Sequence, residues 1–200
     1  MRLVLDWDGT VTEVDSLDLV LGEFGDPEIY ERVEAELDAR TMTLNEVIAA
    51  EFETVTALLP EVVDWLLARV RVRAGFAELA RAHRPLILSS GFHELIEPVL
   101  EREGVQGAVE LRANRLDPQP SGWRTRFRVS EICPHCGEAC KRADLPTDGE
   151  VVYAGDGYSD FCAALAADRV FATDSLARRL GEQGVPFTPL TDFFELASEL

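Results

Sequence analysis

Short apolar runs alternate with helical patterns along this chain, and this alternation constrains the fold more than any other feature. Apolar runs typical of buried strands lie at residues 3–5, 85–92 and 151–155, and each ends in small, hydroxyl or acidic residues. Strands that alternate with helices favour a parallel α/β sheet. Such sheets bind ligands at the carboxyl ends of their strands, so the residues after each run are the first candidates for function.

The long stretch between the first two strand runs has a different pattern. Residues 16–70 contain four successive helical segments and no strand signal, whereas residues 107–130 have the Gly, Pro and alternating pattern of a β-hairpin. The sequence therefore predicts an α/β protein with a Rossmann-like parallel sheet core, residues 1–11 plus 73–200. A helical cap, residues 12–72, is expected as an insert after the first strand.

The charge balance limits the kinds of partner. The chain has 19 basic and 37 acidic residues and a formal net charge of −18. Such a surface repels nucleic acids and anionic membranes, so we expect neither as a partner. No signal-peptide pattern and no 18-residue apolar span is present, which favours a cytoplasmic protein. An anionic substrate would need a local cation in order to bind.

Oxygen-bearing side chains follow three of the predicted strands. They are Asp6, Asp8, Thr10, Ser89, Ser90, Asp156 and Asp160. Residues two apart on an extended chain point to the same side, so Asp6 and Asp8 should converge. Paired carboxylates repel each other unless a cation lies between them, and Mg²⁺ prefers such hard oxygen ligands. The sequence therefore predicts Mg²⁺ as cofactor.

This group of side chains can transfer a phosphoryl group. One carboxylate can act as a nucleophile and form an aspartyl-phosphate, while a second can protonate the leaving group and then activate water. Lys141, the only lysine in the chain, can supply the cation that holds phosphoryl oxygens. An ammonium group is a compact point charge, unlike the wide planar guanidinium of Arg.

Four stretches in the expected order resemble the motifs of the haloacid dehalogenase superfamily of phosphohydrolases. They are DWDGT, LILSS, the segment with Lys141, and GDGYSD. The resemblance implies Asp6 as nucleophile and Asp8, which the dehalogenases lack, as acid and base. It also implies Mg²⁺ held by the Asp6 carboxylate, the Asp8 carbonyl and Asp156.

The same resemblance assigns roles to the remaining residues. Ser89, with its neighbour Ser90, and Lys141 would grip the phosphoryl group, and Thr10 would lie beside it. Asp160 would support the metal or Lys141, and Gly157 belongs to the same fourth motif.

The helical insert resembles the cap of the phosphoserine phosphatase-like branch. In that branch a cap acid and a cap arginine read the substrate, and Asp15 and Arg40 fall near those positions. The segment CPHCGEACK and the C-terminal EQGVPFTPLTDFFEL further resemble methionine-salvage 2-hydroxy-3-keto-5-methylthiopentenyl-1-phosphate phosphatases and phosphocholine/phosphoethanolamine phosphatases. The expected activity is hydrolysis of a small phosphorylated metabolite. Alternatives are a phosphoserine phosphatase, a phosphotransferase to a small acceptor, or a catalytically retired binding protein.

Three of the four cysteines precede the lysine, and their role has several interpretations. Cys133, Cys136 and Cys140 could supply three thiolates to zinc, but a structural zinc site needs four ligands. Cys162 is expected to lie apart from them and to pack within an apolar helix. We therefore expect plain thiols that order the loop before Lys141, with a zinc site or a redox switch as alternatives.

Overall fold

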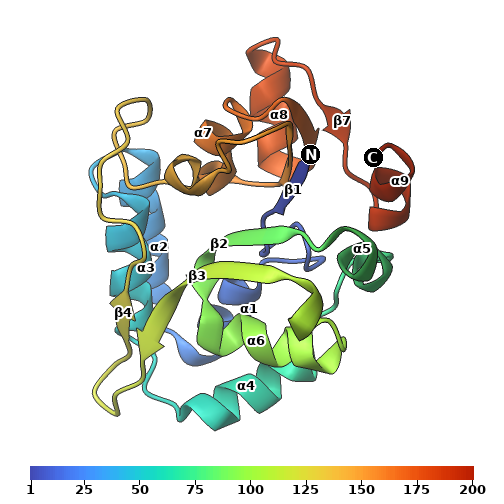
Figure 1. Ribbon diagram of the computed structural model, residues 1–200. Coiled ribbons are helices and arrows are strands. Elements are labelled where there is room, and N and C mark those ends of the chain that lie inside the picture. The colour runs from blue at the N-terminus through green and yellow to red at the C-terminus, as the bar shows by residue number, and fades with distance from the viewer.

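The computed structural model describes all 200 residues, which form one sheet with helices on both faces (Figure 1). The strand order is β4-β3-β2-β1-β5-β6-β7. The strands are β1 (Arg2–Leu5), β2 (Leu86–Phe92), β3 (Glu110–Asp117), β4 (Arg124–Arg126), β5 (Val151–Gly155), β6 (Arg169–Ala172) and β7 (Thr188–Pro189). Neighbouring strands are parallel except for the β3–β4 hairpin. The predicted α/β Rossmann-like core and the hairpin are confirmed.

The central strand β1 shows why the apolar runs are continuous rather than alternating. Leu3 and Leu5 face the large core cluster on one side of the sheet, and Val4 faces a second cluster on the other side. Successive strand residues point to opposite faces, so a strand covered on both sides needs apolar residues throughout. The run ends at Asp6, where the chain leaves the sheet at its carboxyl edge.

Nine α-helices connect and cover the strands. They are α1 (Ser16–Phe24), α2 (Pro27–Asp38), α3 (Leu44–Phe52), α4 (Leu59–Leu67), α5 (Phe76–His83), α6 (His93–Arg102), α7 (Phe161–Ala164), α8 (Asp174–Glu182) and α9 (Phe193–Ser198). Helix α6 continues through Pro98, and its apolar face, which includes Val99 and Leu100, is buried in the core. None of these helices combines the length and the hydrophobicity that a transmembrane span requires.

Two pairs of helices in the insert have different surroundings. Helices α1 and α4 contribute to the large core cluster, and α3 joins it through Ile48 and Phe52, whereas α2 meets α3 in a small cluster built on Val33, Leu37 and Val47. Helices α2 and α3 stand together at one side of the molecule in Figure 1. The chain enters and leaves the insert at one place, because Thr12 and Val72 form an antiparallel bridge. We propose residues 12–72 as the cap on this basis.

Candidate active site

The carboxyl ends of β1, β2 and β5 bring the polar side chains of the motifs together. Asp6 and Asp8 follow β1, Ser89 lies in β2, and Asp160 follows β5 by five residues. All four are buried, with exposed fractions of 4%, 8%, 0% and 0%. Buried carboxylates require partners, because removing an unpaired charge from water is costly. The partners of each one therefore define the chemistry of this edge.

Lys141 lies between two of these carboxylates. Its Nζ donates to Asp6 Oδ1 at 2.5 Å and to Asp160 Oδ1 at 2.7 Å, and the residue is only 3% exposed. Burial opposes the charge of the ammonium group, but Asp160 and Asp6 together hold the pKa of Lys141 above its usual range. The lysine is therefore a fixed positive charge beside the predicted nucleophile.

Asp160 has partners for both of its carboxylate oxygens. Besides Lys141, Oδ1 accepts from the hydroxyl of Tyr153 at 2.6 Å, and Oδ2 accepts from the amides of Asp156 and Gly157 at 3.0 and 2.9 Å. Burial would raise the pKa of Asp160, but Lys141 and these hydrogen bonds hold it below the usual range. Asp160 is thus a permanent anion that positions Lys141 and the turn after β5.

Asp8 has a different environment. Its Oδ1 accepts from the amide of Ser16 at 3.1 Å and from the Ser16 hydroxyl, and Ser89 Oγ lies 3.4 Å from Oδ2. Burial raises the pKa of Asp8, and the bonds from Ser16 offset only part of this effect. A carboxyl group with a raised pKa can hold a proton near neutral pH and donate it to a leaving group.

The turn between Asp8 and the cap is fixed by Gly9 and Arg73. Gly9 has a φ of +69°, and a Cβ at this position would collide with the carboxylate of Asp156. The guanidinium of Arg73 donates to the carbonyls of Gly9 and Thr10 at 2.8 and 2.9 Å. The Thr10 hydroxyl in turn donates to Asp156 Oδ1 at 3.2 Å. The first and fourth motifs are thereby held against each other.

The carboxylates at this edge suit a divalent cation. Oxygens of Asp6, Asp156 and Asp160 lie within 4.8 Å of one another. Burial and the nearby Asp160 raise the pKa of Asp6 well above its usual range, and the same two causes raise that of Asp156 to about 6. Lys141 supplies a single positive charge to Asp6 and Asp160 together, so the three carboxylates keep an excess of negative charge, and hard oxygen donors suit Mg²⁺.

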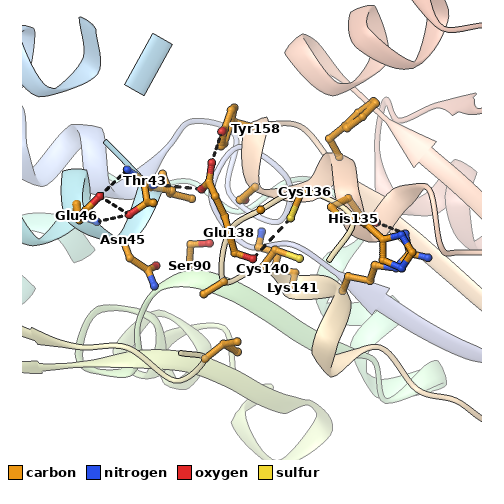
Figure 2. A pocket seen from close by; sticks show the side chains of 18 of the residues that line it. Thr43, Asn45, Glu46, Ser90, His135, Cys136, Glu138, Cys140, Lys141 and Tyr158 are labelled. Atoms are coloured by element: carbon orange, nitrogen blue, oxygen red, sulfur yellow. Dashed lines mark hydrogen bonds between the residues drawn. The ribbon is translucent and has the colours of Figure 1, made fainter. Parts of the chain in front are cut away.

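Two adjoining cavities open at the carboxyl ends of these strands. The inner cavity, about 150 Å³, is lined by Asp6, Asp8 and Lys141, and the outer cavity measures about 610 Å³. Five residues line both, namely Leu44, Ser90, Lys141, Tyr158 and Ser159. Figure 2 shows the outer cavity, where Thr43 and Asn45 of the cap face the loop of residues 130–145, here called the Lys141 loop. Glu138 joins the two sides, accepting from the Leu44 amide at 3.2 Å and from the Tyr158 hydroxyl at 2.5 Å.

The structure places Asp15 and Arg40, the two cap residues expected to bind the substrate, at different cavities. Asp15 lines the inner cavity, but its carboxylate also caps α1 by accepting from the amides of Leu17 and Asp18. Arg40 is exposed, has a φ of 58°, and lines the outer cavity. The two residues therefore do not face the same cavity, and their roles remain proposals.

Three residues of the site were missed by sequence reasoning. Ser16 begins α1, whose cap is Asp15, and its amide and hydroxyl donate to Asp8, a contact that local sequence does not indicate. Arg73 carried no signal, because its role depends on the return of the chain from the cap. Tyr153 did have a recognisable signal in the sequence, because its hydroxyl lies within an otherwise apolar strand run.

The cysteines lie differently from our expectation. Cys162 does not pack apart from the others: its Sγ lies 3.8 Å from that of Cys133. The Sγ atoms of all four cysteines lie within 4.8 Å of one another. The expectation of isolated packing was wrong because α7 turns back toward the loop before Lys141, a contact that sequence spacing does not encode.

Glu51 on α3 also lines the inner cavity and makes the stability of the fold pH-dependent. It is 5% exposed and its Oε1 has no hydrogen-bond partner. Burial, then Glu34 and Asp18, raise the pKa of Glu51 from its ordinary value of 4.5 to about 8. Between these values the unfolded chain has lost the proton that the folded chain keeps, so stability falls as the pH rises.

We expect Glu51→Gln to remove this loss, because the amide cannot ionise. Between pH 5 and pH 8 the free energy of unfolding of the parent protein should fall by on the order of 2 kcal/mol through Glu51. The Glu51→Gln variant should lack this part of the decrease. Urea unfolding at pH 5, 6.5 and 8 measures this difference. Glu61→Gln, at an exposed position of α4, is the matched control. An unchanged pH profile in Glu51→Gln would contradict the assignment.

Comparison with known proteins assigns the chain that carries these motifs to a family. The family model of the haloacid dehalogenase-like hydrolases matches residues 3–165, which is most of the chain and contains all four motifs. The chain belongs to this family. It is therefore a hydrolase of the haloacid dehalogenase type, as the motif resemblance implied.

Relatives and solved structures agree with this assignment. A 2-hydroxy-3-keto-5-methylthiopentenyl-1-phosphate phosphatase of Geobacillus kaustophilus is 30% identical over 213 residues, covering 99% of this chain and 94% of that protein. The enzyme of the same name from Geobacillus thermodenitrificans is 29% identical over 210 residues, with the same coverage. A substrate-bound phosphoserine phosphatase has a TM-score of 0.70 at 17% identity, covering 100% of this chain and 98% of that one. At that identity, the likeness supports the family fold.

Proposed function

We propose that this hydrolase is a Mg²⁺-dependent phosphomonoesterase that acts on a small phosphorylated metabolite through an aspartyl-phosphate on Asp6. The observation that carries the proposal is the buried contact of Asp6 Oδ1 with Lys141 Nζ at 2.5 Å, next to the cavity that also contains Asp8. A nucleophile, a fixed cation and a proton donor thus meet at one small cavity. The two Geobacillus relatives, which match this chain over 94% of their own length, are named phosphatases.

The first half of the reaction uses the two aspartates of the first motif. A carboxylate oxygen of Asp6 attacks phosphorus, and the bond from phosphorus to the ester oxygen breaks. Asp8, whose pKa is raised by burial, gives its proton to that departing oxygen. The alcohol leaves, and the phosphoryl group remains on Asp6.

The second half returns the enzyme to its starting state. Asp8, now ionised, takes a proton from a water molecule as that water attacks phosphorus. The acyl-phosphate bond breaks, inorganic phosphate leaves, and Asp6 is again a carboxylate. Ser16 holds Asp8 in place in both steps through its amide and hydroxyl.

The phosphoryl oxygens need donors as charge builds on them. Lys141 is the nearest cation, and the Ser89 hydroxyl lies at the same edge, where its oxygen accepts from the Gly91 amide at 2.8 Å. That bond fixes the Ser89 oxygen, and the Ser89 hydroxyl, which donates to Asp8 Oδ2 at 3.4 Å, can turn its proton to a phosphoryl oxygen. Preorganised donors of this kind stabilise the transition state more than the ground state.

Asp6, Asp156 and the carbonyl of Asp8 are the groups that would hold Mg²⁺. When bound, the ion supplies positive charge that lets Asp6 ionise and that neutralises phosphoryl oxygens. The Thr10 hydroxyl donates to the Asp156 carboxylate, and the amides of Asp156 and Gly157 donate to Asp160. These contacts hold Asp156 in place.

The cavities favour a small organic group on the phosphate. The inner cavity of about 150 Å³ suits the phosphoryl group, and the outer cavity of about 610 Å³ leaves room for a metabolite-sized remainder. The first candidate substrate is that named for the relatives, 2-hydroxy-3-keto-5-methylthiopentenyl-1-phosphate.

One observation favours a second candidate, a phosphomonoester that also carries an ammonium group. Four acids of the cap line the inner cavity, and they are Asp15, Asp18, Glu34 and Glu51. Glu51 has an oxygen without a hydrogen-bond partner there. A cation on the substrate would satisfy that oxygen and balance the neighbouring acids. Phosphoserine and phosphoethanolamine carry an ammonium group that can donate to this oxygen, whereas the trimethylammonium group of phosphocholine supplies only the positive charge.

Release of inorganic phosphate from a panel of phosphomonoesters tests the proposal. We expect the purified protein to hydrolyse p-nitrophenyl phosphate with Mg²⁺ and to lose this activity when Mg²⁺ is omitted. The ratio of kcat/KM between the methylthiopentenyl ester and the three ammonium-bearing esters decides between the two candidate substrates. No phosphate release from any ester with Mg²⁺ present would refute the proposed activity.

A further inference from the structure

The strongest feature that phosphoryl transfer leaves unused is the group of four cysteines. Cys133, Cys136 and Cys140 lie in the loop before Lys141, and Cys162 lies in α7. Their four Sγ atoms lie within 4.8 Å of one another, and those of Cys133 and Cys162 are 3.8 Å apart. Zinc–sulfur bonds of about 2.3 Å place the sulfurs of a tetrahedral site about 3.8 Å apart. The spacing therefore fits one metal ion held by four thiolates.

The loop is folded in a way that presents sulfur to a cation. The amide of Gly137 donates to the carbonyl of Cys133 at 2.9 Å, and Gly137 itself has a φ of +80°. This turn aims the amides of His135 and Cys136 at the Cys133 sulfur. Amide donors that face a sulfur stabilise it as a thiolate, the form that binds metal.

The surroundings of the cluster are suited to hold a charged metal site. Cys133 and Cys162 are buried, Cys140 is half-buried, and Cys136 is exposed, so an ion can enter from the Cys136 side. Figure 2 shows Cys136 and Cys140 beside Lys141 at the outer cavity. Four thiolates and one divalent ion carry a net charge of about −2. Arg142 and Arg179 line the same cavity and can balance it.

We propose that Cys133, Cys136, Cys140 and Cys162 form a structural zinc site that fastens the Lys141 loop to helix α7. The site is separate from the magnesium carboxylates, because soft thiolates select zinc and hard oxygens select magnesium. Cys140 directly precedes Lys141, and Cys162 follows Asp160 by two residues. The zinc therefore ties together the two segments whose ion pair positions the catalytic ammonium group.

Metal analysis of protein purified without chelator tests the proposal. We expect about one zinc per chain in the parent protein and less than a tenth of that in Cys133→Ser, Cys140→Ser and Cys162→Ser. His135→Asn, in the same loop, is the matched control and should keep its zinc. Cys162→Ser decides the point, because full zinc in this variant would overturn the four-thiolate site.

Two further measurements keep the proposal testable if a variant fails to fold. Native mass spectrometry of the parent protein should show the mass of one bound zinc, and disulfides without zinc would overturn the proposal. Iron in place of zinc, with its visible absorption, would also overturn it. Reduced, metal-free parent protein should bind one equivalent of Co²⁺ with the absorption bands of a tetrahedral cobalt–thiolate centre. The absence of those bands would contradict the geometry.

The structural role has its own readout, which is independent of activity. Removal of zinc should increase amide hydrogen exchange in residues 130–145 and in α7, while exchange in β1 should stay unchanged. Equal protection of the loop with and without zinc would contradict a fastening role.

Discussion

Asp6→Asn should lower kcat for p-nitrophenyl phosphate by at least about 10³-fold, equal to about 4 kcal/mol of transition-state stabilisation. The amide retains the size and shape of the carboxylate but cannot act as the nucleophile. Its amide group also cannot balance Lys141, which lies 2.5 Å from Asp6 Oδ1 in the parent protein. Steady-state assays with Mg²⁺ measure the effect.

A control variant and a chemical trap make this result specific. Asp64→Asn makes the same change at an exposed position of α4 and should have parental activity. Acid quenching of the parent protein during turnover should leave one phosphoryl group on the peptide that contains Asp6, detected by mass spectrometry. A fully active Asp6→Asn protein would sink the mechanism.

Lys141→Arg should lower kcat by about 10²- to 10³-fold although it keeps the positive charge. The ammonium group lies between Asp6 and Asp160 at 2.5 and 2.7 Å, in a position that is 3% exposed. A guanidinium is wider and planar, so it cannot take the same position between the two carboxylates without moving one of them. The loss should therefore come from geometry and not from charge.

Two accompanying measurements separate geometry from folding. Arg32→Lys, at an exposed position of α2, is the control for exchange of one cation for the other. Lys141→Ala should be rescued in part by added methylammonium, which returns an ammonium group to the cavity. Parental rates in Lys141→Arg would refute the argument that the site needs an ammonium group.

The proposed catalytic edge could be predicted from the sequence because its residues lie in short local segments. Asp6 and Asp8 follow one strand, and Asp156 and Asp160 follow another, so strand polarity alone brings them to one edge. Lys141 was recognisable because it is the only lysine. These features need only the order of strands and the direction in which each one ends.

The supporting contacts could not be read in this way. Arg73 reaches the carbonyls of Gly9 and Thr10 only because the chain returns from the cap beside the place where it left. Ser16 reaches Asp8 through a turn whose shape depends on Gly9. Such contacts depend on how elements pack, and local propensity does not encode packing.

The cysteines show the same division most clearly. By itself, the sequence determined a parallel α/β core, the acidic strand ends and a lone lysine after three cysteines, because these are local patterns. Only the tertiary structure decided that Cys162 completes the group of four. Its contact with Cys133 joins residues 29 apart in the chain, and it exists because α7 packs against the Lys141 loop.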